Sequence, residues 1–348
     1  MASFWVNGRP VSAESGKLID FLRDDLRLTS VKNACGTGAC GACTVLIDGA
    51  KKRACVTDVA RLEGKRVLTV EGLTEREKAV YAHAFSAAGA VQCGFCIPGM
   101  VISAKALLDQ NLSPERRDVK AAIRGNICRC TGYQKIEDAI LLAADIFREN
   151  RPVEAHRAFG LLGEDIPRVD APAKALGEGL FADDVILPGM LHAKALRSKY
   201  PRALVKKIDL ARALRHPECV RILTAFDVPF NKTGHLVPDW DVMIAEGDVT
   251  RYVGDAICLA AAERRGALDE ILALVDVEYE ELTPLLTPDE ALAEGAPRLH
   301  EKGNILFQQE VERGDAEGAI ARAAHKVTRV YDTPMTDHAF MEPECAIA

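Results

Sequence analysis

Hydrophobic and polar positions follow one another in short runs over residues 1–73, and this pattern predicts a small β-rich domain. Apolar residues at positions 18, 19, 22 and 26 fit one short helix within it. The dipeptides Asn7-Gly8 and Asp48-Gly49 are typical of two-residue hairpin turns. Strands are predicted beside these turns and at the end of the region, over 4–11, 44–47 and 66–70. Two hairpins around one helix are the layout of a β-grasp domain.

Residues 74–148 change to the spacing of helices, with apolar positions three and four residues apart. Thr74 and Glu77 predict a capping box at the start of the first helix. Ser113 before Pro114 predicts the start of another helix, because proline is favoured at the first helical position. The last helix is expected to bury one face, made of Ile136, Ala139, Ile140, Ala143 and Phe147. The region therefore predicts a compact helical bundle.

The second half of the chain alternates between strand and helix patterns. Residues 149–170 contain Pro152 and Pro167 and little periodicity, so they are the expected linker. Residues 171–290 then predict a mixed α/β domain. Its strands are expected over 191–197, 253–261 and 275–279, with a helix over 264–274. Residues 291–348 are expected to begin one further domain, with a strand around 331–347.

Composition limits the classes of function that are open to this chain. Hydrophobic residues make up 48% and charged residues 27% of the sequence, as in ordinary globular proteins. The net charge of −7 argues against nucleic-acid binding, which needs a clustered basic surface. One basic run, Lys51 to Arg53, is expected to be a solvated hairpin tip or, alternatively, a docking patch for an acidic partner.

Cysteine usage indicates the compartment and the chemistry. No apolar stretch approaches the roughly 20 residues that span a bilayer, so no membrane association is expected. The N-terminus lacks the pattern of a signal peptide. Eleven cysteines without an export signal point to a reducing compartment, where cysteines serve metals or catalysis more often than disulfides. The expected location is the cytoplasm.

The first cysteine set is Cys35, Cys40 and Cys43 in the sequence CGTGACGAC, followed by Cys55. C-x4-C-x2-C with a distant fourth cysteine is the plant-type [2Fe–2S] spacing, and the intervening glycines suit a loop that wraps closely around a cluster. Zinc sites usually pair two short C-x2–4-C hooks, whereas one long loop here holds three ligands. The glycines also match a dinucleotide fingerprint, but that motif should follow a strand and open a helix. The spacing therefore predicts an iron–sulfur cluster.

The second set pairs Cys93 and Cys96 with Cys128 and Cys130 in the helical region. C-x2-C alone is a weak signal, and C-x-C has poor geometry for a disulfide. The residues by themselves leave three interpretations open: a second iron–sulfur cluster, a zinc site or a redox dithiol.

Four motifs together carry a family resemblance: CGTGACGACTVLIDG, RACVT, QCGFCIPGM and GNICRCTGY. In this order they resemble the iron–sulfur region of the molybdenum hydroxylases, the xanthine dehydrogenase and aldehyde oxidoreductase family, over residues 3–148. The resemblance implies that Cys35, Cys40, Cys43 and Cys55 hold a distal cluster in a β-grasp domain (1–73). It implies that Cys93, Cys96, Cys128 and Cys130 hold a second cluster in a helical bundle (74–148), nearer the molybdenum cofactor. Gln92 and Cys130 are then expected beside the pterin.

The resemblance continues more weakly into the second half. Residues 169–182 and Arg251–Asp255 resemble the hammerhead α/β domain of the molybdenum-binding part, and residues 238–244 with the following segment resemble xanthine dehydrogenases described as selenium-dependent. Residues 338–344 resemble the first strand of the cofactor domain, although His338 and Glu342 are expected to be ordinary packed strand residues. Cys219, Cys258 and Cys345 fit no ligand spacing and are expected to be buried apolar thiols.

This resemblance implies an α+β multidomain chain that carries electrons from a molybdenum cofactor through two [2Fe–2S] clusters. Only about 20 residues separate the iron–sulfur and hammerhead-like parts, so no FAD is expected in this chain, and electrons would pass to a separate FAD subunit or another acceptor. The sequence stops at Ala348 inside an expected strand, so a fragment, a split gene product or a truncated chain is expected. Molybdopterin would then bind only with a downstream molybdenum-binding portion or subunit, and no catalytic residue is assigned.

The leading hypothesis is the electron-transfer portion of a purine hydroxylase resembling xanthine dehydrogenase. An aldehyde or other heterocycle hydroxylase of the same family is the alternative enzyme. A stand-alone ferredoxin-like carrier is a further alternative, against which the hammerhead-like part counts, and a regulatory redox sensor is the last.

Overall fold

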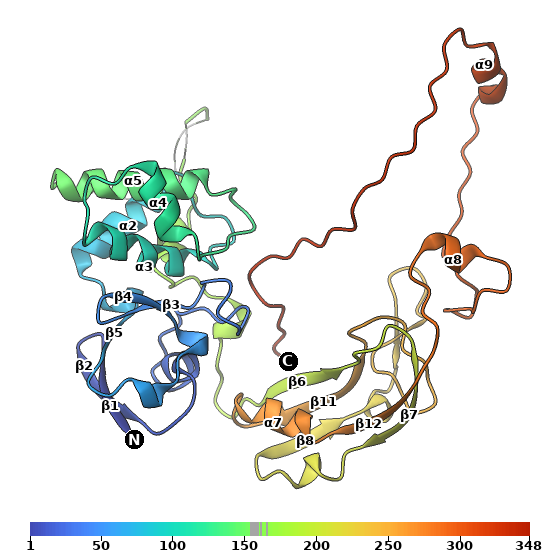
Figure 1. Cartoon of the computed structure of the whole chain (residues 1–348), viewed down its shortest axis with the longest axis horizontal. Helices are drawn as coiled ribbons and strands as arrows, with labels where there is room; N and C mark the ends of the chain where they lie inside the picture. The colour runs from blue at the N-terminus through green and yellow to red at the C-terminus, as the bar shows by residue number, and fades with distance from the viewer. Residues whose placement is uncertain (154–159, 161, 165) are drawn as a thin grey trace. The chain divides into compact units, whose positions relative to one another are not determined.

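The computed structural model describes residues 1–153, 160, 162–164 and 166–348, and it divides into two compact units (Figure 1). One unit comprises Met1–Val185 with Pro334–Ala348, and the other comprises Ile186–Thr333. Among the described residues, no helix combines the length and the apolar character needed to cross a membrane.

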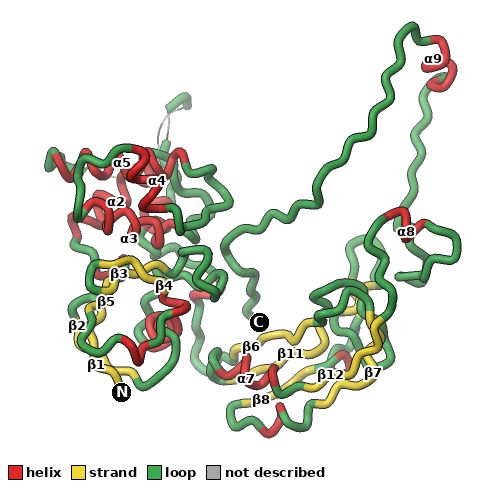
Figure 2. Tube along the Cα trace, viewed as in Figure 1, coloured by secondary structure: helices red, strands yellow, loops and turns green. Residues whose placement is uncertain are grey.

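A five-stranded sheet with one short helical segment forms the first part of the larger unit (Figure 2). The strand order is β2-β1-β5-β3-β4, in which β1 and β5 run parallel and the other neighbours run antiparallel. Alternate residues of β1 are buried against Leu18, Ile19 and Leu22 of the helical segment, as the apolar pattern predicts. The strands are β1 (Ala2–Val6), β2 (Arg9–Ala13), β3 (Thr44–Ile47), β4 (Ala50–Arg53) and β5 (Arg66–Leu68), and the helix is α1 (Leu18–Asp20), continued by a π-helical turn over Phe21–Asp25.

Helices form the second part of this unit and share one apolar core. They are α2 (Glu75–Ala87), α3 (Ile97–Leu108), α4 (Arg116–Ile123), α5 (Gln134–Arg148) and, after the linker, α6 (Ala171–Ala175). The predicted Thr74–Glu77 capping box is present at the start of α2. The predicted start at Ser113 is wrong, because Glu115 caps α4 through its own capping box with Asp118.

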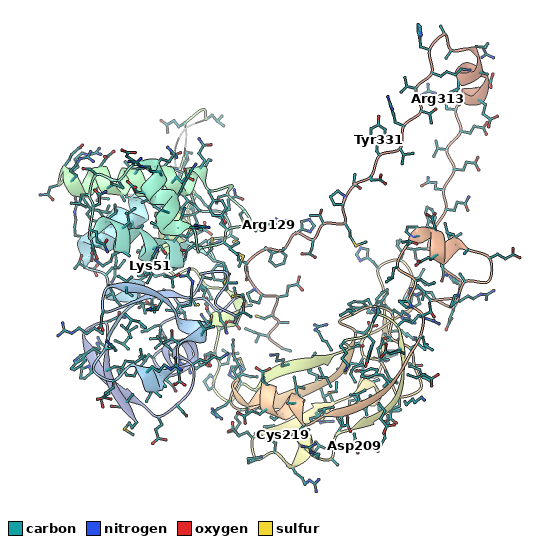
Figure 3. All side chains as sticks on the ribbon, in the orientation of Figure 1. Lys51, Arg129, Asp209, Cys219, Arg313 and Tyr331 are labelled. Atoms are coloured by element: carbon teal, nitrogen blue, oxygen red, sulfur yellow. The ribbon has the colours of Figure 1, made fainter. Side chains whose placement is uncertain are left out.

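Lys51 lies on β4 beside the helical part (Figure 3), and its ammonium group donates to the Ala122 carbonyl near the end of α4. Arg53 donates to the Gly125 carbonyl and to Thr44 Oγ1. Lys51 is exposed, as expected of a solvated run, but its ammonium group and the half-buried Arg53 guanidinium both bond backbone carbonyls of the helical part. Both cations satisfy carbonyl groups at the C-terminal end of a helix, where positive charge is favourable.

The second unit consists of small antiparallel sheets and one covering helix. Its strands are β6 (His192–Arg197), β7 (Ala203–Asp209), β8 (Cys219–Leu223), β9 (Lys232–Thr233), β10 (Trp240–Asp241), β11 (Ala256–Ala262) and β12 (Asp276–Glu281). The helix α7 (Ala267–Ala273) packs on the β6-β11-β8 sheet, and β12 pairs with β7. Two further short helices follow, α8 (Pro288–Leu292) and α9 (Ala316–Arg322).

The end of the chain differs from its sequence prediction. Residues 323–348 are all described and contain no helix or strand, and Tyr331 is 85% exposed. The strand expected around 331–347 is therefore wrong for this structure. A strand requires a hydrogen-bonded neighbour, and no other described strand pairs with this segment.

Candidate iron–sulfur centres

The loop that carries Cys35, Cys40 and Cys43 is shaped by glycines. Gly36, Gly38 and Gly41 have φ values of 64°, 82° and 78°, a conformation that other residues rarely adopt. Gly41 is also needed for space, because a Cβ there would lie 2.3 Å from the Gly125 carbonyl oxygen. The loop therefore folds tightly and packs closely against the turn before Cys128.

Backbone N–H groups within this loop point at a ligand sulfur. The N–H groups of Thr37 and Cys40 both donate to Cys35 Sγ, each at 3.4 Å. Burial opposes ionisation of Cys35, but the hydrogen bonds from Thr37 and Cys40 outweigh it and lower its pKa to about 6. The loop thus stabilises a thiolate, which is the form that binds metal.

Cys43 and Cys55 form the second half of this set. Cys43 directly precedes β3, and Cys55 lies in the 3₁₀ turn Ala54–Val56 that follows β4, so the antiparallel pairing of β3 and β4 brings the two together. Both are buried, and their thiols are within hydrogen-bond reach. Burial raises the pKa of Cys43 to about 12, and the neighbouring Cys55 thiol adds to this increase. A cation beside these thiols would reverse that shift.

The other four cysteines come from two helix ends. Cys93 and Cys96 precede α3, and Cys96 occupies its N-cap position, whereas Cys128 and Cys130 lie in the turn before α5. Cys93 and Cys130 approach to 3.6 Å between sulfurs. A hydrogen bond from the Cys96 thiol lowers the pKa of Cys128 to about 5, and the same contact raises the pKa of Cys96.

Each set therefore contains cysteines in pairs. The thiol pairs are Cys35 with Cys40, Cys43 with Cys55, Cys93 with Cys130, and Cys96 with Cys128. Each iron of a [2Fe–2S] cluster takes two thiolates, whereas a zinc ion draws four ligands to one point at about 2.3 Å. Within the described residues, no group of three or more metal-binding side chains converges on a single-ion site. The paired donors fit a binuclear cluster in each set.

Asn126 connects the two sets. Its side-chain amide is buried and donates to the Gly41 carbonyl at 3.0 Å and to Thr44 Oγ1 at 3.2 Å, and its oxygen accepts from Ser103 at 2.8 Å. The next residue, Ile127, donates its N–H to the Cys40 carbonyl at 2.7 Å. One hydrogen bond therefore joins a cysteine of the first set to the residue before Cys128.

The remaining predicted positions are less enclosed. Gln92 is exposed and Cys130 is half-buried. Cys258 is buried as expected, but Cys219 is half-buried and Cys345 is exposed, so the expectation of buried thiols is wrong for these two. His338 and Glu342 lie in the segment without regular structure, and the packed strand expected for them is wrong.

Three buried residues around these loops are not indicated by any sequence pattern. Asn126 stands beside Gly125 before a C-x-C pair, and an asparagine there is easily taken for an ordinary turn residue. Lys32 and Phe181 lie about 150 positions apart in the sequence, yet the Lys32 ammonium group is 4.7 Å from the centre of the Phe181 ring. Periodicity contains no information about such a long-range contact.

Three family models match this chain. A 2Fe-2S iron–sulfur cluster binding domain matches residues 15–80, and a [2Fe-2S] binding domain matches residues 69–141. The a/b hammerhead domain of aldehyde oxidase and xanthine dehydrogenase matches residues 176–283. These matches confirm the predicted order of a β-grasp cluster domain, a helical cluster domain and a hammerhead domain.

Curated relatives and solved structures agree with these matches. An aldehyde oxidoreductase from Megalodesulfovibrio gigas is 34% identical over 95% of this chain, which spans 39% of that relative's length. The nicotinate dehydrogenase small FeS subunit of Eubacterium barkeri is 43% identical, over 39% of this chain and 87% of the subunit. A solved aldehyde oxidoreductase from Desulfovibrio gigas aligns with a TM-score of 0.82 and 32% identity, covering 93% of this chain and 38% of the other. This chain belongs to the molybdenum hydroxylase family, which includes the aldehyde oxidoreductases and xanthine dehydrogenases.

Proposed function

We propose that this chain conducts single electrons between a molybdenum cofactor and an external acceptor. Cys35, Cys40, Cys43 and Cys55 are the proposed ligands of one [2Fe–2S] cluster, and Cys93, Cys96, Cys128 and Cys130 those of the second. When bound, each cluster takes up and releases one electron at a time. The observation that carries the proposal is the pairing of the cysteine thiols within each set.

The protein's own atoms connect the two sites. The Cys40 carbonyl accepts the N–H of Ile127, and the peptide bond of Ile127 leads directly to Cys128. Asn126 holds the two sides of this connection together through Gly41 and Thr44. This connection supports transfer between the sites over covalent bonds and one hydrogen bond, with no side chain required to move.

The proposed direction runs from the second set to the first. By the family resemblance, Gln92 and Cys130 lie beside the pterin, so electrons enter at Cys130 and leave at Cys35. The exposed Gln92 and the half-buried Cys130 support an open face at this end. A pterin cofactor needs a largely enclosed site with converging polar groups, so we propose that a further molybdenum-binding portion or subunit covers this face.

The family resemblance and the relatives also support proposals about the partners of this chain. A relative that is a separate small FeS subunit supports the proposal that cluster domains of this kind work with other subunits. We propose a separate FAD subunit or another carrier as the acceptor at the Cys35 end. We also propose a cytoplasmic location, because cysteines that hold clusters must stay reduced.

Purines are the proposed substrate class of the enzyme to which this chain contributes. The support is the resemblance of residues 238–244 and the following segment to xanthine dehydrogenases. Aldehydes are the second candidate, and the 34% identity to an aldehyde oxidoreductase over 95% of this chain favours them. Hydroxylation itself is proposed to need residues other than the cluster ligands.

The test begins with the chain purified from a host that makes the molybdenum cofactor. We expect clusters in the purified chain but no pterin, and no dye reduction driven by xanthine or by an aldehyde. Turnover above that of a cluster-free control, or stoichiometric pterin, would contradict the proposal that this chain only transfers electrons and that a further portion or subunit binds the pterin. With a partner portion added, xanthine-dependent but not aldehyde-dependent dye reduction is the expected result, and the reverse preference would refute the purine assignment.

A further inference from the structure

The segment after the linker lies against the cluster domains. Residues 171–184, which we call the strap, begin with α6 and end with a 3₁₀ turn over Ala182–Asp184. The hammerhead family model already matches from residue 176, yet the structure places the chain as far as Val185 in the unit of the cluster domains. The strap therefore belongs spatially to the electron-transfer part.

Phe181 of the strap lies in one apolar cluster with residues of both cysteine loops. Its side chain is buried in one apolar group with Cys40, Ala42 and Phe95, against which Cys35 and Cys93 also pack. The rings of Phe181 and Phe95 meet edge to face, with centroids 5.2 Å apart. Since Phe95 lies between Cys93 and Cys96, this contact joins the strap to the second cysteine loop, and the shared apolar cluster extends to Cys40 and Ala42 of the first.

Buried charges hold this end of the strap. Asp184 accepts from Lys32 Nζ at 2.5 Å and from Arg23 Nη2 at 2.9 Å, and all three side chains are at most 6% exposed. Arg23 also reaches Asp183 at 3.2 Å and donates to the Val31 carbonyl. Removing the Asp184 charge would leave two buried cations without this carboxylate, which is strongly unfavourable.

The other end of the strap packs just as closely. Ala171 and Ala175 are buried in the core of the helical part. A Cβ on Gly177 would lie 2.4 Å from Ser30 Cβ, and a Cβ on Gly94 would lie 2.7 Å from the Lys174 side chain. The strap therefore has contacts with both cluster domains that leave no room for an extra methyl group.

We propose that the strap excludes water from the space between the two cluster sites, and that Phe181 is the positioning residue that sets their redox potentials. This inference rests on the proposed assignment of clusters to the two cysteine sets. A cluster with its four thiolates is an anion, and reduction adds one more negative charge. Burial disfavours the reduced cluster, which is the more highly charged form. Excluding water therefore lowers the reduction potential of each cluster and also slows the loss of iron.

Phe181→Ala in the full chain tests this directly. We expect both potentials to rise, because water entering beside the loops stabilises the reduced forms. We also expect iron to be lost to a chelator about tenfold faster, as when other residues around a metal site are removed. The control is Phe226→Ala, which truncates a phenylalanine that is 84% exposed in the other unit and should change neither quantity.

Phe181→Leu keeps the apolar bulk and should restore both potentials, which separates water exclusion from any need for an aromatic ring. Asp184→Asn should reproduce the Phe181→Ala result, and Asp183→Asn should have a smaller effect, because Asp183 is more exposed and reaches Arg23 rather than Lys32.

Two failures can be distinguished. If the wild-type chain does not hold two [2Fe–2S] clusters by iron analysis and EPR, the proposed function fails. If the wild type holds both, but Phe181→Ala lowers the melting temperature while its potentials and chelation rate stay at wild-type values, the strap only stabilises the fold and the inference is wrong.

Discussion

The two cysteine sets reach similar arrangements by different routes. The first set lies mostly on one glycine-shaped loop, where N–H groups of Thr37 and Cys40 already point at Cys35. The second set is assembled from two helix ends, Cys93–Cys96 and Cys128–Cys130, more than 30 positions apart. The first site is therefore organised locally by the backbone, whereas the second depends on how the helices pack.

From this difference we expect different structural changes to disturb each site. The local loop should tolerate loosening of the helices but not a change at its glycines. The assembled site should respond to any change that separates α3 from the turn before α5. Asn126 and Ile127 couple the two, so a change at that junction is expected to affect both.

The largest effect is expected from removing one ligand of each set. Cys43→Ser should abolish the EPR signal of the first cluster and spare the second, and Cys128→Ser should do the reverse. Each variant should retain about half the iron, because each set is proposed to hold one binuclear cluster, and should lose stability only in its own domain. EPR with iron analysis measures this. Loss of both signals from either change would show that the sites are not independent.

A second, smaller effect is expected at Gly41. Gly41→Ala combines a positive φ with a Cβ 2.3 Å from the Gly125 carbonyl oxygen, and should destabilise the chain by about 3 kcal/mol. Gly36→Ala is the matched control, since its φ is also positive but no atom lies within 4 Å of the added Cβ, and about 1–2 kcal/mol is expected. Thermal unfolding compares the two. Equal losses would mean that the close approach to Gly125 is unimportant.

Asn126 tests the junction itself. Asn126→Leu removes hydrogen bonds to Gly41, Thr44 and Ser103 at a buried position, and about 2 kcal/mol of stability should be lost. The magnetic interaction between the reduced clusters should weaken as their separation increases. Gln110→Ala, at an exposed position on the same unit, should change stability by less than about 0.5 kcal/mol. An unchanged EPR interaction in Asn126→Leu would contradict the assigned role.

The smallest effect depends on pH. Burial opposes ionisation of Glu77, but bonds from Lys105 and Thr74 outweigh it and lower its pKa below the ordinary 4.5. The stabilisation is therefore fully present above 4.5 and is lost as pH falls through the lower folded value. Glu77→Gln should cost about 1 kcal/mol near neutral pH, and the difference from wild type should shrink in acid. Denaturant unfolding at several pH values measures it, and a difference that grows in acid would have the wrong sign.

Sequence patterns predicted the elements that depend on local chemistry. The Asn7-Gly8 and Asp48-Gly49 turns and the capping box at Thr74 are present, and the expected face of α5 is buried except at Phe147, which is half-buried. Each of these features is decided within a few residues. The start of α4 was missed by two positions, since capping by Glu115 competes with Ser113 and Pro114. The strand expected near the end of the chain failed because a strand needs a distant partner.

The site shows the same limit. The cysteine spacings and the family resemblance predicted which residues gather, and the paired thiols agree with that grouping. The strap and the Lys32–Asp184 pair were not predicted, because they join segments about 150 residues apart.

Iron and acid-labile sulfide analysis, together with EPR of the dithionite-reduced full chain, tests the central claim most directly. With two binuclear clusters per chain, we predict four irons, four sulfides and two distinct signals of equal intensity. Two irons per chain with a single signal, or zinc retained at Cys93, Cys96, Cys128 and Cys130, would contradict it.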